Sequence, residues 1–375
     1  MIFLSAADDL LRGQPNVGKS SVLLANIIPC FVVKLIAPHY VRIIPYGYLV
    51  STCILLSLVS LLTVALFKSI AVSFFGIVLA SASSGLGETA FLALTSYHHP
   101  QTVIAWSSGT GAAGIVGAFY YLVLATWFGL SMKTTLLIAS LFPCAMGVAY
   151  LLLLSPEHTN ICIEVEESED NSIPKTTSSL SRNDSLFSAM LPLLKNRFLI
   201  LKPLMLRYVA PLFLVYYCEY VINNSVYFSL LFPLEKTPFT QYRQHYPTYS
   251  ALYQTGVFLS RTLARTLPIT NEWTFAGMQA VMLVFLSIET AYGIVANVYV
   301  IFALILVEGL LGGAAYVNTF CNISEKVPKE HVEFSMAFTT VADSTGISLA
   351  GLTCLLYEPF LCARNSLCMA NRVPP

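Results

Sequence analysis

Long apolar segments separated by short polar ones run through almost the whole chain, and this pattern predicts a membrane-embedded bundle of α-helices. A spanning helix needs about 20 consecutive, mainly apolar residues to cross the hydrocarbon core of a bilayer. We therefore expect ten spans, at residues 20–38, 47–67, 69–97, 103–128, 133–154, 208–232, 247–263, 273–292, 295–320 and 334–357. Residues 1–11 (MIFLSAADDLL) have the composition of the end of a truncated first helix.

One long polar segment, residues 155–206, divides the chain into two halves. It carries an acidic cluster, then Ser/Thr-rich sequence, then several basic residues, a composition typical of a disordered linker. A sorting or phosphorylation segment is the alternative interpretation. The predicted regions are an N-terminal bundle (1–154), this linker, a C-terminal bundle (207–357) and a divergent tail (358–375).

The distribution of basic residues predicts the orientation, because cytosolic loops are enriched in Lys and Arg. With the linker in the cytosol, twelve of the 20 Lys and Arg residues lie on the cytosolic side and eight on the other. The bias is modest and has the expected sign.

The composition agrees with lipid as the solvent. Hydrophobic residues make up 56% of the chain and charged residues 11%, whereas a soluble domain carries about 25% charge. The formal net charge is zero, so no nucleic-acid partner is expected. Most of the nine cysteines lie in apolar runs, and we interpret them as small buried hydrophobic residues without a disulfide framework.

Two sequence patterns resemble enzyme motifs, but the residues around them do not fit those motifs. Residues 13–20 (GQPNVGKS) match the P-loop pattern, but a P-loop lies between a strand and a helix of an α/β domain, and these residues precede an apolar span. The six histidines lie in loops or near helix ends, without the helical spacing of a zinc hydrolase. We therefore expect no enzyme activity, no cofactor and no metal.

Four carboxylates lie inside otherwise apolar spans: Glu88, Glu219, Glu308 and Asp343. A charged side chain at the middle of a bilayer costs about 2.5–3.5 kcal/mol on insertion scales, so each must face protein, water or a partner. Either they line a cavity or proton path, or they form structural hydrogen bonds and ion pairs between helices. Burial favours the neutral carboxyl form, which would suit proton-coupled movement. For Glu219, the neighbouring tyrosines and Asn223 are candidate hydrogen-bond partners.

Two cations accompany these acids. Lys34 and Arg261 lie towards the predicted cytosolic ends of their spans. Both could extend to the membrane interface with their charged ends in water. The alternative is an anion-binding role, for which arginine offers a bidentate fork.

Matching segments in the two halves indicate an internal duplication. Leu86-Gly87-x-x-Ala90-Phe91 corresponds to Leu311-Gly312-x-x-Ala315-Tyr316, and the next spans share a Thr-Gly pair at residues 110–111 and 345–346. Duplicated halves with glycine-interrupted helices point to a transporter site between them. Close packing of small residues is the simpler alternative for several of these glycines.

The same segments carry a resemblance to a known family. The chain resembles the battenin family of lysosomal membrane proteins over about residues 3–352, outside the variable linker. The matching strings are LSAADDLL, IIPCFVVKLIAP, SSGLGE, WSSGTGAAG, CEYVIN, LYQTGVFLSR, EGLLGGAAYVNTF and DSTGISL. The resemblance implies an all-α, major-facilitator-like bundle of eleven helices, distantly similar to equilibrative nucleoside transporters. It also implies residence in a late endosomal, lysosomal or vacuolar membrane.

Carried over by position, Glu88, Glu219, Arg261 and Glu308 fall on charged positions of the family's motifs, and Asp343, which opens the last string, corresponds to the family's acid before its Gly-Ile-Ser. Lys34 lies in another motif, and Tyr316 and Asn318 lie in the longest, so we include all three as candidates for the solute or proton path. The chain departs from the family in its truncated first helix and in its C-terminal sequence, which lacks a cysteine placed for prenylation.

The sequence therefore predicts a lysosomal transporter-like protein that moves a small anionic or zwitterionic solute, with protons as a further candidate. The resemblance implies glycerophosphodiesters or basic amino acids such as arginine as solutes, and a contribution to lysosomal pH. Its site is expected between spans 69–97, 208–232, 295–320 and 334–357. The rival interpretation is a non-transporting scaffold that regulates endolysosomal trafficking through cytosolic partners of residues 155–206.

Overall fold

The computed structural model describes residues 19–41, 43–67, 69–99, 101–121, 123–124, 128–153, 202–263 and 271–372. Within these ranges the regular elements are helices and no strand occurs, as expected for a chain that must satisfy its backbone polar groups inside a membrane. The segment predicted to end a first helix (1–11) and most of the predicted linker (155–201) lie outside the described residues.

The N-terminal half forms helices close to the predicted spans. They are α3 (Lys19–Ile36), α4 (Tyr46–Leu66), α5 (Ile70–Thr95), α6 (Gln101–Tyr121), α7 (Met132–Ala139) and α8 (Leu141–Leu153). Helices α7 and α8 together make up the predicted span 133–154. The described part of the false P-loop is the start of α3, which agrees with our rejection of that motif.

The C-terminal half is built from longer helices. They are α11 (Ala210–Val221), α12 (Tyr227–Ser229), α13 (His245–Thr262), α14 (Glu272–Tyr292), α15 (Val298–Lys326), α16 (Lys329–Arg364) and α17 (Ser366–Arg372). Two π-helical turns, Met205–Val209 and Ile222–Val226, flank α11 and join it to α12 in one span. Helix α16 continues seven residues beyond the predicted end of its span.

Seven helices in the described part of the chain are long and apolar enough to cross a membrane. They run over Tyr46–Leu66, Ile70–Thr95, Met132–Leu152, Lys202–Ser229, Glu272–Tyr292, Val298–Lys326 and Lys329–Arg364. A shorter apolar helix covers Ala25–His39. The chain is therefore an all-α, multi-pass membrane protein, and the predicted count of ten complete spans stays a prediction.

Asparagine side chains begin two of the long helices. The Asn271 side chain accepts a hydrogen bond from the Trp273 N–H at the start of α14, and the Asn297 side chain accepts one from Tyr299 at the start of α15. Such caps satisfy N–H groups that have no partner within the helix. Gly293 ends α14 in a left-handed conformation with φ of 61°, which glycine adopts without a steric penalty.

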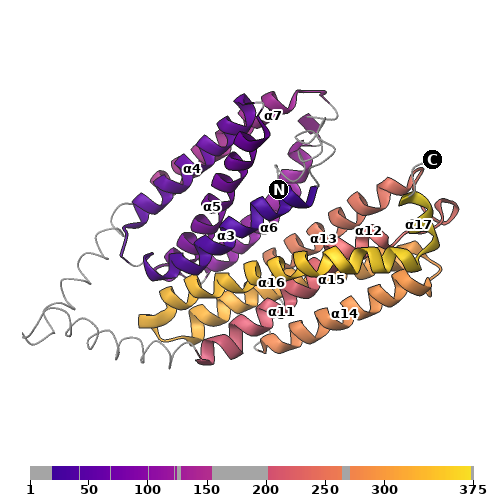
Figure 1. The fold of residues 1–375 in the computed structure, drawn as a ribbon. Coiled ribbons are helices and arrows are strands. Elements are labelled where there is room, and N and C mark those ends of the chain that lie inside the picture. The colour runs from indigo at the N-terminus through magenta and orange to yellow at the C-terminus, as the bar shows by residue number, and fades with distance from the viewer. Residues whose placement is uncertain are drawn as a thin grey trace, which may run out of the picture.

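The two halves form separate helix bundles that lie side by side (Figure 1). Across the boundary, α3 and α5 pack against α16, and α6 packs against α13. The polar network described below lies on the first of these two contacts. The boundary between the halves is therefore the place where the fold brings distant charged residues together.

Glycines set the close approach of several helix pairs. A methyl group at Gly313 of α15 would lie 2.6 Å from the Val257 carbonyl oxygen of α13, and one at Gly346 of α16 would lie 2.7 Å from the Phe213 carbonyl oxygen of α11. Gly309 faces the Tyr253 carbonyl in the same way. The small-residue explanation thus holds for these positions, because a larger residue would push the backbones apart.

One expectation about cysteine is wrong. Cys362 and Cys368 form a disulfide that joins the end of α16 to α17. The helix breaks at Asn365, and this break brings the two Cα atoms to 5.2 Å although six positions separate them in the sequence. Cys53, Cys218 and Cys354 are buried as predicted, whereas Cys144 is exposed on the protein surface.

We expect Gly309→Ala to lower the thermal stability of the protein in detergent micelles. The added methyl group meets the backbone of α13, and overpacking of this kind costs about 1–3 kcal/mol. Gly277→Ala in α14 is the matched control, because a methyl group there meets nothing within 4 Å. Equal melting temperatures for the two variants would contradict the assigned packing role.

Candidate functional site

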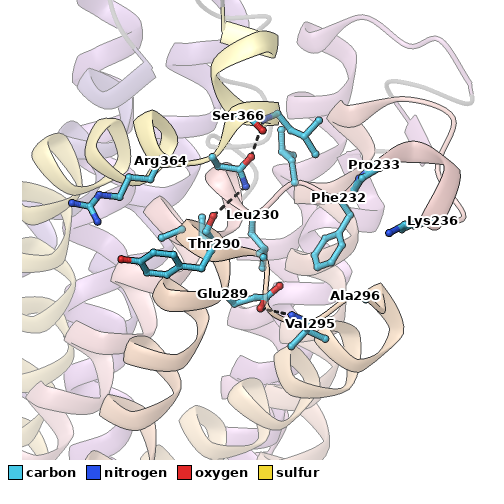
Figure 2. Close-up of a pocket in the computed structure, with 16 residues that line it drawn as sticks. Leu230, Phe232, Pro233, Lys236, Glu289, Thr290, Val295, Ala296, Arg364 and Ser366 are labelled. Atoms are coloured by element: carbon cyan, nitrogen blue, oxygen red, sulfur yellow. Dashed lines mark hydrogen bonds between the residues drawn. The ribbon is translucent and has the colours of Figure 1, made fainter.

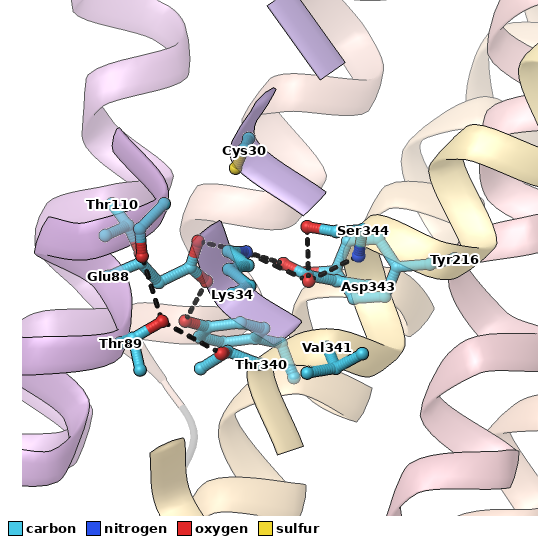
Figure 3. A network of polar contacts seen from close by, with 12 residues as sticks. Cys30, Lys34, Glu88, Thr89, Thr110, Tyr216, Thr340, Val341, Asp343 and Ser344 are labelled. Carbon is cyan, nitrogen blue, oxygen red and sulfur yellow. Dashed lines mark hydrogen bonds and ion pairs between the residues drawn. The ribbon is translucent and has the colours of Figure 1, made fainter. Parts of the chain in front are cut away.

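A lysine from the N-terminal half is held between two carboxylates, one from each half. The Lys34 ammonium of α3 lies 2.6 Å from Glu88 Oε2 of α5. It also donates to both carboxylate oxygens of Asp343 on α16, at 3.0 and 2.8 Å. Only 2% of the Lys34 side chain is exposed. Figure 3 shows this ammonium between the two acids, and we call the three residues the ion cluster.

Helix geometry explains how two short sequence patterns build half of this cluster. Cys30 and Lys34 are four residues apart on α3, and Gly85 and Glu88 are three apart on α5, so each pair shares one helix face. A methyl group at Gly85 would lie 2.8 Å from the Cys30 carbonyl oxygen. The glycine therefore lets α5 approach α3 at that level, which brings Glu88 to Lys34 one turn further along.

Further polar groups fix the two carboxylates. The Ser344 backbone N–H and hydroxyl both donate to Asp343 Oδ1, at 2.5 and 3.1 Å. The hydroxyls of Thr89 and Thr340 lie 3.2 Å apart beside the cluster and again join α5 to α16 (Figure 3). With one cation and two ionised carboxylates the cluster carries a formal charge of −1, so loss of either negative charge leaves a balanced ion pair.

A second cation lies next to the cluster and contacts aromatic rings. The Arg261 guanidinium of α13 stacks 4.2 Å from the centre of the Tyr316 ring and donates to the Thr110 hydroxyl at 2.8 Å and to the Tyr216 hydroxyl at 3.1 Å. The Tyr316 hydroxyl donates to Glu88 Oε1 at 2.9 Å. Tyr316 thus connects Arg261 to the ion cluster, and Thr110 makes this a second polar contact between the halves.

The idea that both cations extend to the membrane interface is wrong. Lys34 is buried and ion-paired, and Arg261 is partly buried with its hydrogen bonds directed to Thr110 and Tyr216 inside the protein. Among the described residues, no carboxylate lies within 4 Å of the Arg261 guanidinium. Because its positive charge is balanced only by rings and hydroxyls at that distance, Arg261 can accept an anion without first releasing an acidic partner.

The other two acids lie in the C-terminal half, apart from the ion cluster. Glu308 is fully buried and accepts hydrogen bonds from Tyr227 at 2.6 Å and Gln279 at 3.0 Å. These contacts match the interpretation in which the acid forms structural hydrogen bonds between helices. Glu219 accepts a hydrogen bond from Tyr253 of α13, and not from the tyrosines beside it in the sequence.

One oxygen of Glu219 remains without a hydrogen-bond partner among the described residues. The Glu219 carboxylate fills the space that a side chain at Gly312 would need. Asn318, the remaining sequence candidate, donates to the Ala314 carbonyl oxygen of its own helix at 2.9 Å.

Sequence reasoning missed a further contact between the halves. Glu333, in the first turns of α16, accepts hydrogen bonds from Tyr46 at 2.6 Å and Tyr97 at 2.8 Å, and these tyrosines lie at the start of α4 and just after α5. A search of apolar spans for charges passes over Glu333, because it lies near a polar turn. Its 8% exposure shows that it is buried all the same.

The arrangement allows the buried charged groups to exchange their ionic partners. The described residues contain no group of three or more His, Cys, Asp or Glu placed to hold a metal ion. They do contain charged groups that bridge two bundles and that a proton or a competing ion can separate. Such a contact is suited to a change in the relative position of the halves.

Comparison with known proteins gives one consistent result at the level of sequence. A family model described as "CLN3 protein" matches residues 1–364. The chain is 40% identical to Protein BTN1 of Yarrowia lipolytica over 362 residues, covering 96% of this chain and 90% of that protein. It is also 40% identical to Battenin of Canis lupus familiaris over 357 residues, covering 92% of this chain and 78% of that protein.

Solved structures agree on the fold. A bacterial homologue of the iron transporter ferroportin in an outward-facing state matches with a TM-score of 0.58 at 14% identity, covering 99% of this chain and 95% of that one. The human organic anion transporter MFSD10 matches with a TM-score of 0.52 at 12% identity, covering 98% and 88%. At these identities the likeness shows the fold alone, which is the predicted major-facilitator-like arrangement.

We expect Lys34→Met to destabilise the protein far more than Asp343→Asn. Removing the lysine leaves two buried carboxylates without their cation, and breaking a buried pair in this way costs about 3–5 kcal/mol. Asp343→Asn keeps the pair of Lys34 and Glu88. Thermal unfolding in detergent micelles measures the difference, and a larger loss for Asp343→Asn would overturn this assignment of charges.

We also expect Glu333→Ala to loosen the contact between the halves. It removes two hydrogen bonds to a charged acceptor, each worth about 1.5–3 kcal/mol. Pulsed electron paramagnetic resonance between spin labels at the exposed positions Ile43 and Glu325, with the other free cysteines replaced, should show longer distances. Glu330→Ala changes an exposed acid one turn away and is the control. Identical distance distributions for the two variants would exclude this role.

Proposed function

The chain belongs to the CLN3 protein family, and we propose that it carries small solutes across a membrane by alternating access between its two halves. The single observation that carries the proposal is the buried ion cluster, in which Lys34 of one half holds Asp343 of the other. A transporter of this fold has to break and remake contacts between its halves. Charged contacts that a ligand or proton can displace provide such a step.

The surroundings of Arg261 favour a solute with an acidic group. The guanidinium offers planar, paired N–H donors to a carboxylate or phosphodiester, and no acid within 4 Å among the described residues competes for them. We therefore favour glycerophosphodiesters over arginine within the solute classes that the family resemblance implies. A basic solute would instead compete with Lys34 for Glu88 and Asp343.

Binding at Arg261 also provides a route to the contact between the halves. An anion drawn to the guanidinium competes with its contacts to the Thr110 hydroxyl and the Tyr316 ring. Tyr316 donates to Glu88, so a shift of its ring alters a hydrogen bond to the ion cluster. Solute binding and the Lys34 contact are in this way energetically coupled.

The proposal also includes coupling of transport to protons and residence in a lysosomal or vacuolar membrane. Because two carboxylates share one ammonium, protonation of one of them leaves a neutral ion pair, and this supports coupling of transport to a proton. The resemblance to the battenin family supports a lysosomal or vacuolar membrane, where transport linked to protons would contribute to luminal pH.

We expect Arg261→Gln to reduce the flux of glycerophosphoethanolamine into proteoliposomes by about tenfold or more, because a charge-assisted hydrogen bond contributes about 1.5–3 kcal/mol. Arg261→Lys keeps the charge but loses the planar fork, and should be intermediate. Arg207→Gln is the matched control, since Arg207 also lies over a tyrosine ring but is exposed. Wild-type flux from a folded Arg261→Gln protein would rule out this role of the arginine.

A further inference from the structure

A cavity of about 430 Å³ lies at one end of the C-terminal half, away from the ion cluster. The segment after α12, the end of α14, the turn before α15 and the turn between α16 and α17 converge around it (Figure 2). Its volume is in the range of sites for small organic ligands, which is about 300–1,000 Å³. No residue of the ion cluster lines it, so it is a separate place on the molecule.

A buried carboxylate in its wall has an unused oxygen. Glu289 lines the cavity with 2% of its surface exposed. One oxygen accepts the Val295 backbone N–H at 2.9 Å, whereas the other is buried and has no hydrogen-bond partner among the described residues. A buried acceptor without a partner is costly, and more so when it is charged. This oxygen of Glu289 therefore lacks a donor, although Lys236 and Arg364 also line the cavity, and a bound cation at the carboxylate would supply one.

The rest of the wall favours an organic cation over a metal ion. Leu230 and Phe232 give the cavity apolar sides close to Glu289 (Figure 2). No group of three or more His, Cys, Asp or Glu in the described residues could hold a metal ion. A primary ammonium group donates up to three hydrogen bonds and pairs with a single carboxylate. Lys236 also lines the cavity, from an exposed position, and can attract an acidic group on the same ligand.

Two links hold the rim of the cavity in place. The Asn365 side chain donates to the Thr290 carbonyl oxygen at 3.2 Å, which ties the turn after α16 to α14. The disulfide between Cys362 and Cys368 joins the two sides of that turn. Disulfides persist in compartments outside the cytosol. This agrees with the orientation predicted from the basic residues, which puts this end of α16 in the lumen.

We propose that this cavity is a second binding site, for a primary ammonium group with Glu289 as its counter-ion. The group comes from a small luminal amine or from the headgroup of an aminophospholipid. A second, acidic group on the ligand pairs with Lys236. The proposal stands independently of transport through the centre of the molecule, because it rests on a different set of residues.

Calorimetric titration of the purified full chain in maltoside micelles tests the proposal. Ethanolamine should bind saturably, whereas tetramethylammonium, which has no N–H donor, should not. Phosphoethanolamine should bind more tightly than ethanolamine. Lys236→Gln should remove this difference in affinity and leave the binding of ethanolamine itself unchanged. Nanodiscs made with and without phosphatidylethanolamine separate the two sources. If the site binds a lipid headgroup, phosphatidylethanolamine in the nanodisc should block ethanolamine binding. If the site binds a soluble amine, ethanolamine should bind equally well with and without this lipid.

Glu289→Gln should weaken ethanolamine binding by about tenfold or more, since it removes the charge but keeps an oxygen for the Val295 N–H. The exposed Glu235 lies near the rim outside the lining, so Glu235→Gln is the matched control and should bind like wild type. Ala296 is an exposed residue of the lining, so Ala296→Phe should occupy part of the cavity while it leaves Glu289 unchanged, and should also abolish binding. Absence of saturable binding to wild type, or wild-type affinity in either Glu289→Gln or Ala296→Phe, would overturn the proposal.

Discussion

The burial of a lysine ammonium between two carboxylates constrains much of the rest of the structure. An ammonium held away from water needs its charge and its three donors satisfied, and Lys34 obtains this from α5 of its own half and α16 of the other. The close approach of α5 to α3 at Gly85 follows from this requirement, as does the packing of α16 across the boundary. In the proposed alternating access, this contact between the halves is one that movement between them would have to break.

The polar groups around the ion cluster either form contacts within one bundle or form contacts between the two bundles. Glu308 is satisfied within one bundle and contributes to its internal order. Arg261 and Glu333 act between the bundles, one beside the ion cluster and one near the start of α16. Under the proposed transport cycle, a bundle could keep its internal hydrogen bonds, and the contacts between the halves would be the ones exchanged.

The sequence predicts the elements well because the membrane imposes a minimum length on apolar segments, and each predicted span coincides with helical residues. The sequence also identifies charged residues that need a partner, because the free-energy cost of a charge in a membrane span follows from the apolar residues around it. The sequence does not identify which residue is the partner. Of the four acids, Glu88 and Asp343 meet at one lysine although they are far apart in the chain, while Glu219 and Glu308 are held elsewhere.

The burial of Glu333 and the disulfide depend on tertiary contacts or on the end of a helix, and the hydrophobic pattern of the sequence predicts neither. Glu333 lies near a polar turn, where a carboxylate causes no conflict with lipid, and only the packing of α4 and α5 shows that it is buried. The disulfide depends on the end of α16 at Asn365, which brings two cysteines together.

The fit of Glu219 against Gly312 has a consequence for inheritance. The carboxylate occupies the volume that any larger side chain at position 312 would take, so a substitution there displaces the acid as well as disturbing the helix contact. A harmful change at either position should thus give the same defect, and the two changes combined should be no worse than one. In genetic terms, a glycine and an acid on different helices form one functional unit, because loss of either residue removes the same contact.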